Sequence, residues 1–331
     1  MYFSIIIPVY NRPNEIKELL ESLTKQTFIE EFEIVIVEDG SSIDSEEIVK
    51  TFTKTLNISY YYKSNTGPGD SRNFGMKNAK GDYFIIFDSD CIIPENYLQT
   101  VHNYLTQNYV DCYGGPDAAH GSFTVIQKAI NYTMTSFLTT GGVRGKNETL
   151  GKFQPRSFNM GISKKAFEVL GGFGNIHPGE DPDLSMRLWK LGFKTALISQ
   201  AYVYHKRRIN WYNFFIQVNK FGKARPILNK WHPEYNKLTY FFPSVFMLAL
   251  DMSIILALFG VLCPIAVFML YFVILFVFSS INNKSIKIGA YTLIATILQF
   301  YGYGMGFLNS YFKVIILKKN PEKVFPELFF K

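Results

Sequence analysis

The stretch Phe84-Ile-Ile-Phe-Asp-Ser-Asp-Cys91 runs four apolar residues directly into two aspartates that are separated by one residue. A continuous apolar run bounded by polar residues predicts a strand that is buried on both faces, as in parallel sheets. Ligands of such sheets bind at the carboxyl ends of the strands. Asp88 and Asp90 are therefore predicted to lie at a ligand-binding crevice.

Comparable apolar runs recur in the N-terminal part of the chain, with helical patterns between them. The residues predicted to form strands are 3–9, 33–37, 58–62 and 83–87. Residues 13–26 carry apolar side chains at helical spacing with Pro13 near the first turn, and residues 71–79 form a shorter helical pattern. Strands that alternate with helices predict an α/β domain with a mostly parallel sheet. Asn11 and Asp39 also follow predicted strands, so they are expected at the same crevice as the aspartate pair.

Beyond residue 114 the pattern is looser. The expected elements are an amphipathic helix at 122–138, a glycine-rich loop at 139–153, a strand-like run at 156–163, helices at 164–170 and 182–191, and a final strand at 195–204. Aromatic and basic residues mix at 211–231, which is typical of a helix at a membrane interface.

The C-terminal part is strongly apolar, and the whole chain is 48% hydrophobic and 17% aromatic. Residues 241–260, 261–280 and 288–312 are nearly uncharged, and each run is long enough to cross a hydrocarbon layer of ~30 Å. About three transmembrane helices are therefore predicted within 239–317. Asp251 is the one acid in these runs, and it needs a partner or a wet environment.

The formal net charge of +7 is concentrated just before the first apolar run. The basic residues there are Lys206, Arg207, Arg208, Lys220, Lys223, Arg225, Lys230 and Lys237. By the positive-inside tendency, this segment is predicted to lie at the cytoplasmic face against anionic lipids. The prediction is thus a multi-pass protein of the inner or plasma membrane, with residues 1 to about 238 in the cytoplasm. Lys318, Lys319 and Lys323 would lie outside after three spans, so a re-entrant last segment stays open.

Several other classes of protein are disfavoured. No recognition helix, RNP-type strand or zinc finger accompanies the positive charge, so a nucleic-acid partner is not expected. Cys91, Cys112 and Cys263 are scattered, without the spacing of a zinc site or a disulfide framework, and are interpreted as small apolar fillers. The N-terminus lacks the basic region and cleavage site of a secretory signal.

A turn that carries two carboxylates allows one to bind a divalent ion and the other a ligand hydroxyl. Oxygen ligands of this kind suit Mg²⁺ or Mn²⁺, which commonly share their coordination with a diphosphate. The Asp-x-Asp pattern by itself is common in surface turns, so its significance depends on the motifs that accompany it.

Four motifs in order resemble the family 2 glycosyltransferases of GT-A fold, over roughly residues 3–205. They are Ser4-Ile-Ile-Ile-Pro-Val-Tyr-Asn-Arg12, Val37-Glu-Asp-Gly-Ser41, Gly69-Asp-Ser-Arg-Asn73 and Phe87-Asp-Ser-Asp90. Phe158-Asn-Met-Gly-Ile162 is similar to the acceptor-side strand of this family, and Gly179-Glu-Asp-Pro-Asp-Leu-Ser-Met-Arg187 is similar to its Glu-Asp motif. The resemblance implies a Rossmann-like, mostly parallel GT-A catalytic domain.

By this resemblance, the residues at the nucleotide pocket are Pro8, Tyr10, Asn11, Arg12, Asp39, Arg72 and Asp88. Asp39 would accept the N–H of the base, typically uracil, and Asp88 would approach the ribose. Asp90 would bind the Mn²⁺ or Mg²⁺ ion that bridges the diphosphate, and His205 stands where several GT-A enzymes place a further metal ligand. Asp181 would be the general base, with Glu180 and Asn159 in support on the acceptor side.

The chemistry of sugar transfer is consistent with these roles. Negative charge develops on the leaving β-phosphate, so a metal ion and nearby cations such as Arg72 stabilise it. A carboxylate has to take the proton of the acceptor hydroxyl, and the neighbouring Glu180 raises the pKa of Asp181 by like-charge repulsion. A single displacement of this type inverts the anomeric configuration.

Structural roles for these residues stay open at this point. Asp39 fits a turn, Arg72 fits an ion pair inside the domain, and Asp181 fits an N-cap before Pro182. His205 also fits a histidine that binds no metal. Glu38 stands where the family often has aspartate.

The prediction is an inverting, metal-dependent enzyme that transfers a sugar from a UDP-type donor to a lipid-linked or glycan acceptor in surface polysaccharide assembly. Its predicted parts are a GT-A domain (1–205), a basic aromatic segment (206–238), transmembrane helices (239–317) and a tail (318–331). A polyprenyl-phosphate glycosyltransferase and a catalytically silent membrane scaffold are the alternatives. A processive synthase is disfavoured because no Gln-x-x-Arg-Trp is present, and a nucleotidyltransferase or dehydrogenase is disfavoured because residues 9–14 contain no glycine.

Overall fold

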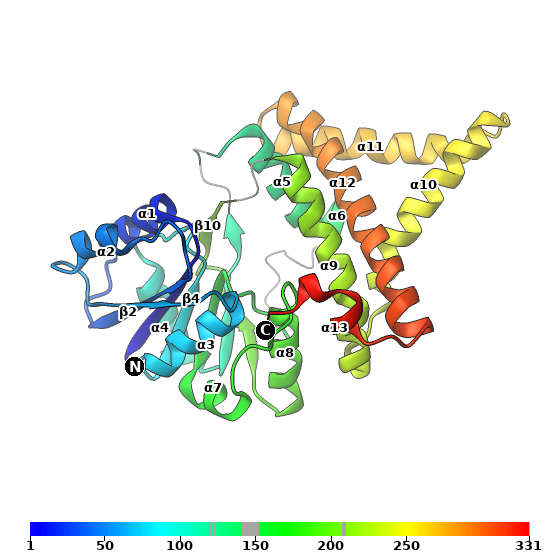
Figure 1. Cartoon of the computed structure of the whole chain (residues 1–331). Helices are drawn as coiled ribbons and strands as arrows, with labels where there is room; N and C mark the ends of the chain where they lie inside the picture. The colour runs from blue at the N-terminus through cyan, green and yellow to red at the C-terminus, as the bar shows by residue number, and fades with distance from the viewer. Residues whose placement is uncertain (119–120, 122, 141–151, 207–209, 331) are drawn as a thin grey trace. The chain divides into compact units, whose positions relative to one another are not determined.

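The computed structural model describes residues 1–118, 121, 123–140, 152–206 and 210–330 (Figure 1). The chain forms two compact units. The first unit contains Met1–His120, Lys146–Lys206 and Phe329–Lys331, and the second contains Gly121–Gly145 and Arg207–Leu328.

The first unit alternates strands and helices through most of its length (Figure 1). Its elements are β1 (Phe3–Val9), α1 (Pro13–Leu23), β2 (Phe32–Asp39), α2 (Glu46–Phe52), β3 (Ile58–Lys63), α3 (Pro68–Asn78), β4 (Tyr83–Phe87), β5 (Cys91–Ile92), α4 (Tyr97–Gln107), β6 (Cys112–Gly114), β7 (Asp117–Ala118), β8 (Asn159–Ser163), α7 (Lys164–Leu170), α8 (Glu180–Lys190), β9 (Thr195–Leu197) and β10 (Val203–His205).

Seven of these strands form one mixed sheet in the order β3-β2-β1-β4-β8-β6-β9. The four strands β3, β2, β1 and β4 are mutually parallel, β8 runs antiparallel to both β4 and β6, and β9 runs parallel to β6. The predicted α/β class with a mostly parallel sheet is therefore confirmed.

Strand β1 shows why its sequence is apolar at every position. Ile5 and Ile7 pack into one core cluster together with Ile16 and Leu20 of α1. Ile6 points to the other face and packs into a second cluster, which includes side chains of α3, α7 and α8. Because both faces of the sheet are covered, both sets of alternating side chains are buried.

The predicted final strand at 195–204 is wrong as a single element. The chain leaves the large sheet after Leu197, turns at Ile198–Ala201, where Ala201 N–H donates to the Ile198 carbonyl, and then forms β10. Strand β10 belongs to a second, three-stranded sheet of order β5-β10-β7. The apolar pattern is continuous because Ile198 and Ala201 in the turn are also buried.

Some elements of the first unit were not predicted. Helices α2 and α4 and the short strand β6 carry no prediction, and α3 begins at Pro68 rather than at residue 71. Pro68 fits the first turn of α3 because proline lacks the N–H that this position leaves unbonded.

The second unit is helical (Figure 1). Its elements are α5 (Val125–Thr135), α6 (Phe137–Thr140), α9 (Trp211–Trp231), η1 (Pro233–Tyr235), η2 (Leu238–Phe241), α10 (Phe242–Leu258), α11 (Cys263–Asn282), α12 (Ile286–Ser310), the π-helical η3 (Tyr311–Ile316), α13 (Pro321–Val324) and η4 (Pro326–Leu328). Residues 141–151, within the predicted glycine-rich loop, lie outside the described residues, as do Arg207 and Arg208.

Helices α9 and α12 approach each other closely through glycines. A Cβ atom on Gly222 would lie 2.2 Å from the Tyr303 carbonyl oxygen, and one on Gly306 would lie 2.2 Å from the Asn219 carbonyl oxygen. Helix α5 joins this unit because Ile130 packs with side chains of α9 and α12. Small residues at such contacts are typical of tightly packed helices, in membranes especially.

Among the described residues, two helical stretches, Leu238–Leu258 and Cys263–Asn282, are long and apolar enough to cross a membrane. Most of their side chains are exposed rather than buried in a core. Helix α12 is longer, but many of its side chains are buried against its neighbours. Asp251 of α10 has the partner that its position demands, because the Tyr301 hydroxyl of α12 donates a hydrogen bond to it. The number of crossings and the orientation stay predictions.

Candidate active site

The polar residues that follow β1, β2 and β4 lie at one edge of the large sheet, as their positions in sequence predict. Tyr10, Asn11 and Arg12 follow β1, Asp39 ends β2, and Asp88 follows β4. Pro8 lies inside β1 and is buried, whereas Tyr10 is exposed at the rim.

The side chain of Asp39 is almost fully engaged by the protein. Its Oδ1 accepts hydrogen bonds from Lys63 Nζ at 2.7 Å and from the N–H of Thr66 at 3.0 Å. Its Oδ2 accepts from the N–H of Gly67 at 3.0 Å. Since a carboxylate oxygen has two lone pairs, Oδ2 retains one position for a ligand N–H.

Asn11 joins the loops that follow β1 and β2. Its φ of 53° is left-handed, a conformation that asparagine tolerates better than most residues. Its side-chain oxygen accepts from the N–H groups of Ser42 and Ile43 at 2.9 and 3.1 Å. The side chain of Asn11 therefore holds the shape of this rim.

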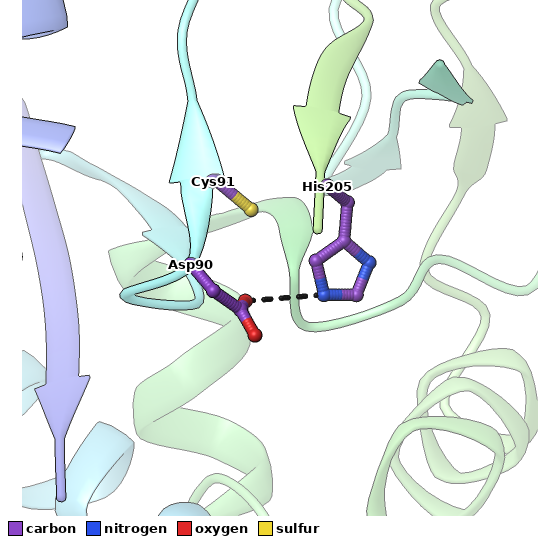
Figure 2. A group of neighbouring side chains, drawn as sticks. All are labelled: Asp90, Cys91 and His205. Carbon is purple, nitrogen blue, oxygen red and sulfur yellow. Dashed lines mark ion pairs between the residues drawn. The ribbon is translucent and has the colours of Figure 1, made fainter. Parts of the chain in front are cut away.

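Asp90 and His205 come together although they are far apart in sequence (Figure 2). His205 Nε2 lies 3.2 Å from Asp90 Oδ1, and Arg12 donates to Asp90 Oδ2 at 2.5 Å. Phe158 stacks on the imidazole with ring centroids 4.6 Å apart and so fixes its plane. Carboxylate oxygen and imidazole nitrogen are donors that bind divalent transition metals, so the residues at this point fit a cation such as Mn²⁺.

Arg72 is buried between two carboxylates. One guanidinium nitrogen lies 2.7 Å from Asp88 Oδ1 and the other lies 3.2 Å from Glu180 Oε1. Burial by itself lowers the pKa of Arg72, but the two carboxylates raise it above its usual value. The ion pair that the sequence analysis considered for Arg72 is thus present. Because one of its partners is Asp88, it lies within the candidate site.

Glu180 and Asp181 begin α8 and have opposite electrostatic environments. Burial alone would raise the pKa of Glu180, but His177 at 2.9 Å, Arg72 and a hydrogen bond from the backbone of Glu180 lower it to about 2. Burial and the charge of Glu180 raise the pKa of Asp181 to about 7. Gly179 occupies the N-cap position, so the capping role considered for Asp181 is not observed.

Asn159 lies in the interior, at the start of β8. Its side-chain oxygen accepts from the Tyr97 hydroxyl at 2.5 Å, and its amide nitrogen donates to the Ala201 carbonyl at 2.8 Å. Asn159 therefore supports the position of β8 and of the turn that leads to β10.

A cavity of about 220 Å³ lies beside His177, between the start of α3 and residues 173–177. Phe330 forms part of its wall and covers Gly67, whose N–H binds Asp39. The Phe330 N–H donates to the Asn175 carbonyl at 3.0 Å, which fixes this covering residue.

Three residues of the site were not found from the sequence: Lys63, Phe158 and His177. Lys63 pairs with Asp39 in the parallel register of β2 and β3, and His177 lies three residues before Glu180. Finding Lys63 requires the register of β2 and β3, and finding His177 requires the conformation of the turn before α8. Composition and periodicity of the sequence provide neither.

A family profile described as "Glycosyl transferase family 2" matches residues 4–171. An uncharacterized glycosyltransferase of Rickettsia bellii is 39% identical over 105 residues, which cover 32% of this chain and 15% of the relative. The poly(ribitol-phosphate) beta-N-acetylglucosaminyltransferase TarS of Staphylococcus aureus is 37% identical over 114 residues, or 34% of this chain and 20% of TarS. Glycosyltransferase GlyG of Streptococcus pneumoniae is 26% identical over 62% of this chain and 70% of GlyG. The first two relatives are thus matched over only a small part of their length.

Two solved structures share the fold. Residues 1–349 of S. aureus TarS in complex with UDP-GlcNAc align with a TM-score of 0.51 at 19% identity, covering 95% of this chain and 92% of that one. The mannosyltransferase PcManGT of Pyrobaculum calidifontis, in complex with GDP-Man and Mn²⁺, aligns with a TM-score of 0.59 at 14% identity, covering 90% and 87%. The predicted GT-A fold, followed by C-terminal helices, is confirmed.

The Lys63–Asp39 pair generates a prediction for nucleotide binding. Lys63→Met keeps the length of the side chain but removes the charged donor to Asp39 Oδ1 and the ion pair with Asp70. A hydrogen bond to a charged group contributes about 1.5 kcal/mol, so we expect UDP to bind about tenfold more weakly. Isothermal titration calorimetry measures this affinity.

Lys50→Met is the matched control, because Lys50 forms only exposed pairs with Glu46 and Glu47 on α2. It should leave the affinity for UDP unchanged. If Lys63→Met binds UDP as tightly as the parent protein, Lys63 has no part in preparing Asp39 for the base.

Proposed function

Because the chain belongs to glycosyl transferase family 2 and is a nucleotide-sugar glycosyltransferase, we propose that it transfers one sugar from a UDP-sugar to a hydroxyl group of a lipid-linked or glycan acceptor, with inversion. The observation that carries the proposal is that two carboxyl groups of the site, those of Asp90 and Asp181, have different environments. Asp90 lies beside His205 and Arg12, whereas Asp181 is half-buried beside Glu180 and has a raised pKa.

The donor end of the site is built from Asp39, Asp88 and the rim that Asn11 holds. The free position on Asp39 Oδ2 accepts the N–H of the base, and Asp88, with its side chain 32% exposed and oriented by Arg72, accepts from the ribose. The uridine assignment is supported by the UDP-GlcNAc complex of the S. aureus relative. The PcManGT complex contains GDP-Man, so GDP-sugars belong in the panel of donors that tests the base.

Asp90 and His205 are the residues that would hold a divalent cation, Mn²⁺ or Mg²⁺. Such an ion, when bound, stabilises the negative charge that develops on the β-phosphate. Support comes from the donor atoms of these side chains and from the Mn²⁺ in the PcManGT complex. Arg12 lies beside Asp90 and is positioned to contact a phosphate oxygen once its partner carboxylate is shared with the cation.

Asp181 accepts the proton of the acceptor hydroxyl as that oxygen attacks the anomeric carbon. Its pKa of about 7 is suited to this step, because a base near the operating pH is both deprotonated and strong enough. Glu180 stays ionised beside Arg72 and His177, so it maintains the raised pKa of Asp181. The sugar–phosphate bond breaks as the new glycosidic bond forms on the opposite face, which inverts the configuration.

The predicted membrane part, residues 239–317, would keep the site near a lipid-carried acceptor, which suits surface polysaccharide assembly. The two long apolar helical stretches and the basic residues of α9 support membrane association with the catalytic domain in the cytoplasm. The same helices favour one second candidate, a polyprenyl-phosphate glycosyltransferase. The acceptor of such an enzyme already carries a negative charge, so its attack would depend little on a base. The raised pKa of Asp181 suits a base and therefore favours a hydroxyl acceptor.

Variants of the two carboxyl groups test the mechanism. Asp181→Asn should lower transfer by about 10²- to 10⁴-fold while UDP still binds, because only proton acceptance is lost. Asp90→Ala should abolish the dependence of UDP affinity on Mn²⁺. Transfer from a panel of nucleotide sugars by the full chain in detergent measures the first effect, and isothermal titration calorimetry of UDP with and without Mn²⁺ measures the second.

Asp44→Asn is the matched control, since Asp44 is exposed and its carboxylate accepts from the N–H of Glu46 at the start of α2. If no donor is turned over and UDP does not bind, the catalytically silent scaffold replaces this proposal. Full transfer by Asp181→Asn would instead favour the polyprenyl-phosphate acceptor.

The raised pKa of Asp181 predicts the pH dependence of transfer. The base has to be deprotonated, so kcat/KM should rise with pH through about 7. One pH unit below this pKa, kcat/KM should be about tenfold lower than its value on the high-pH plateau. Glu180→Gln removes the like charge that raises this pKa, so the acid limb should move to lower pH. If the acid limb of the pH profile stays at the same pH in Glu180→Gln, the group that titrates there is not Asp181.

The membrane orientation has a natural reporter in Cys263, which is exposed at the start of α11, while Cys91 and Cys112 are buried. If α10 crosses from the cytoplasm, a membrane-impermeant maleimide should label Cys263 from outside intact bacterial spheroplasts. Cys263→Ser should remove the label. Labelling that requires broken membranes would show that the α10–α11 turn does not reach the outer side.

A further inference from the structure

The thiol of Cys91 belongs to the same group of side chains as Asp90 and His205 (Figure 2). One ligand atom from each of these three residues lies within 4.8 Å of the other two. Among the described residues, this is the group of histidine, cysteine and acidic side chains whose spacing fits a metal ion.

The strand pairing explains why the thiol and the imidazole converge. Cys91 and His205 are directly opposite each other in the antiparallel pair β5–β10. Side chains at directly opposite positions lie on the same face of the ladder, about 4.5–5.5 Å apart at Cβ. Asp90 lies in a turn before β5, where side chains do not alternate between the faces of a strand. Its carboxylate therefore lies on the same side as the thiol and the imidazole.

Phe158 contacts both His205 and Cys91. Its ring stacks on His205, and its carbonyl oxygen lies 3.5 Å from Cys91 Sγ. Cys91 and Cys112 are both buried in apolar clusters, Cys91 with Phe87 and Ile93 and Cys112 with Met160 and Ile162. Among the described residues, it is Cys91 whose thiol also lies beside a carboxylate and an imidazole.

We propose that Cys91 is a third protein ligand of the divalent cation, which gives the site one oxygen, one nitrogen and one sulfur donor. This rests on the proposed function, in which Asp90 and His205 hold the cation. On coordination the Cys91 S–H bond breaks, a sulfur–metal bond forms, and the proton is released to solvent without any change of oxidation state. Ligand atoms around one ion lie about 3 to 4 Å apart, so small side-chain rotations complete the arrangement.

A sulfur ligand determines which metals the site prefers. Mg²⁺ takes oxygen ligands almost exclusively, whereas thiolate and imidazole favour Zn²⁺, Co²⁺ and Cd²⁺. The site should therefore bind Mn²⁺ in preference to Mg²⁺, and bind Co²⁺ and Zn²⁺ more tightly than either. A site built on Asp90 and His205 alone would follow the same order of affinities with a smaller preference, because it lacks the sulfur donor.

The test uses Co²⁺ with the full-length protein in detergent, without nucleotide. A Cys112→Ser/Cys263→Ser variant retains Cys91 as its single thiol, so any sulfur-to-cobalt charge-transfer absorption in the near ultraviolet must come from Cys91. We expect this band to appear with one Co²⁺ per chain and to disappear in His205→Ala. Replacing Cys91 by Ser in the parent protein should weaken Co²⁺ binding by at least about tenfold, the loss typical even of groups that only support a ligand.

The outcomes separate the two proposals. If Co²⁺ and Mn²⁺ bind in an Asp90-dependent way but no charge-transfer band appears, Cys91 is a packing residue and the proposed metal site stands. If neither ion binds with or without UDP, both the ligand role of Cys91 and the metal dependence of transfer are wrong. Because the band is read in a chain that keeps Cys91, the result does not depend on the folding of a Cys91 variant.

Discussion

The buried guanidinium of Arg72 is the interaction on which the candidate site depends. It joins Asp88, which follows the central strand β4, to Glu180, which begins α8. Removing one partner of a buried ion pair leaves an uncompensated charge and costs about 3–5 kcal/mol. The proposed donor side and the proposed acceptor side of the site are therefore held in one arrangement by a single cation. The same cation keeps Glu180 ionised, and the charge of Glu180 in turn raises the pKa of Asp181.

Pairing with a cation recurs at each aspartate of the crevice. Asp39 pairs with Lys63, Asp88 with Arg72, and Asp90 with Arg12. Unpaired, three carboxylates at one sheet edge would repel a diphosphate, since like charges in a partly buried site interact strongly. The protein cations offset this repulsion before any ligand arrives. Asp181 is the exception, because it lies beside another carboxylate, and this difference supports the proposed role of Asp181 as the base.

The second, three-stranded sheet is small, but it decides the composition of the candidate metal site. By leaving the large sheet after Leu197, the chain brings β10 beside β5 and so places His205 opposite Cys91. Asn159 holds the turn that makes this possible, through its hydrogen bond to Ala201. Asn159, which the resemblance assigns to the acceptor side, thus fixes the path of the backbone that leads to His205.

The sequence by itself determined strands β1 to β4 and helix α1, the mostly parallel class of the sheet, and the presence of Asn11, Asp39, Asp88 and Asp90 at one edge. It could do so because apolar periodicity is local, and because the carboxyl ends of parallel strands share an edge. Only the tertiary structure decided the break of the 195–204 run into two strands, the register that pairs Lys63 with Asp39, and the meeting of Cys91 with His205. These depend on which strands become neighbours across long separations in the chain. The pKa of Asp181 depends on burial in the same way, because the like charge of Glu180 is visible in sequence but the loss of solvent is not.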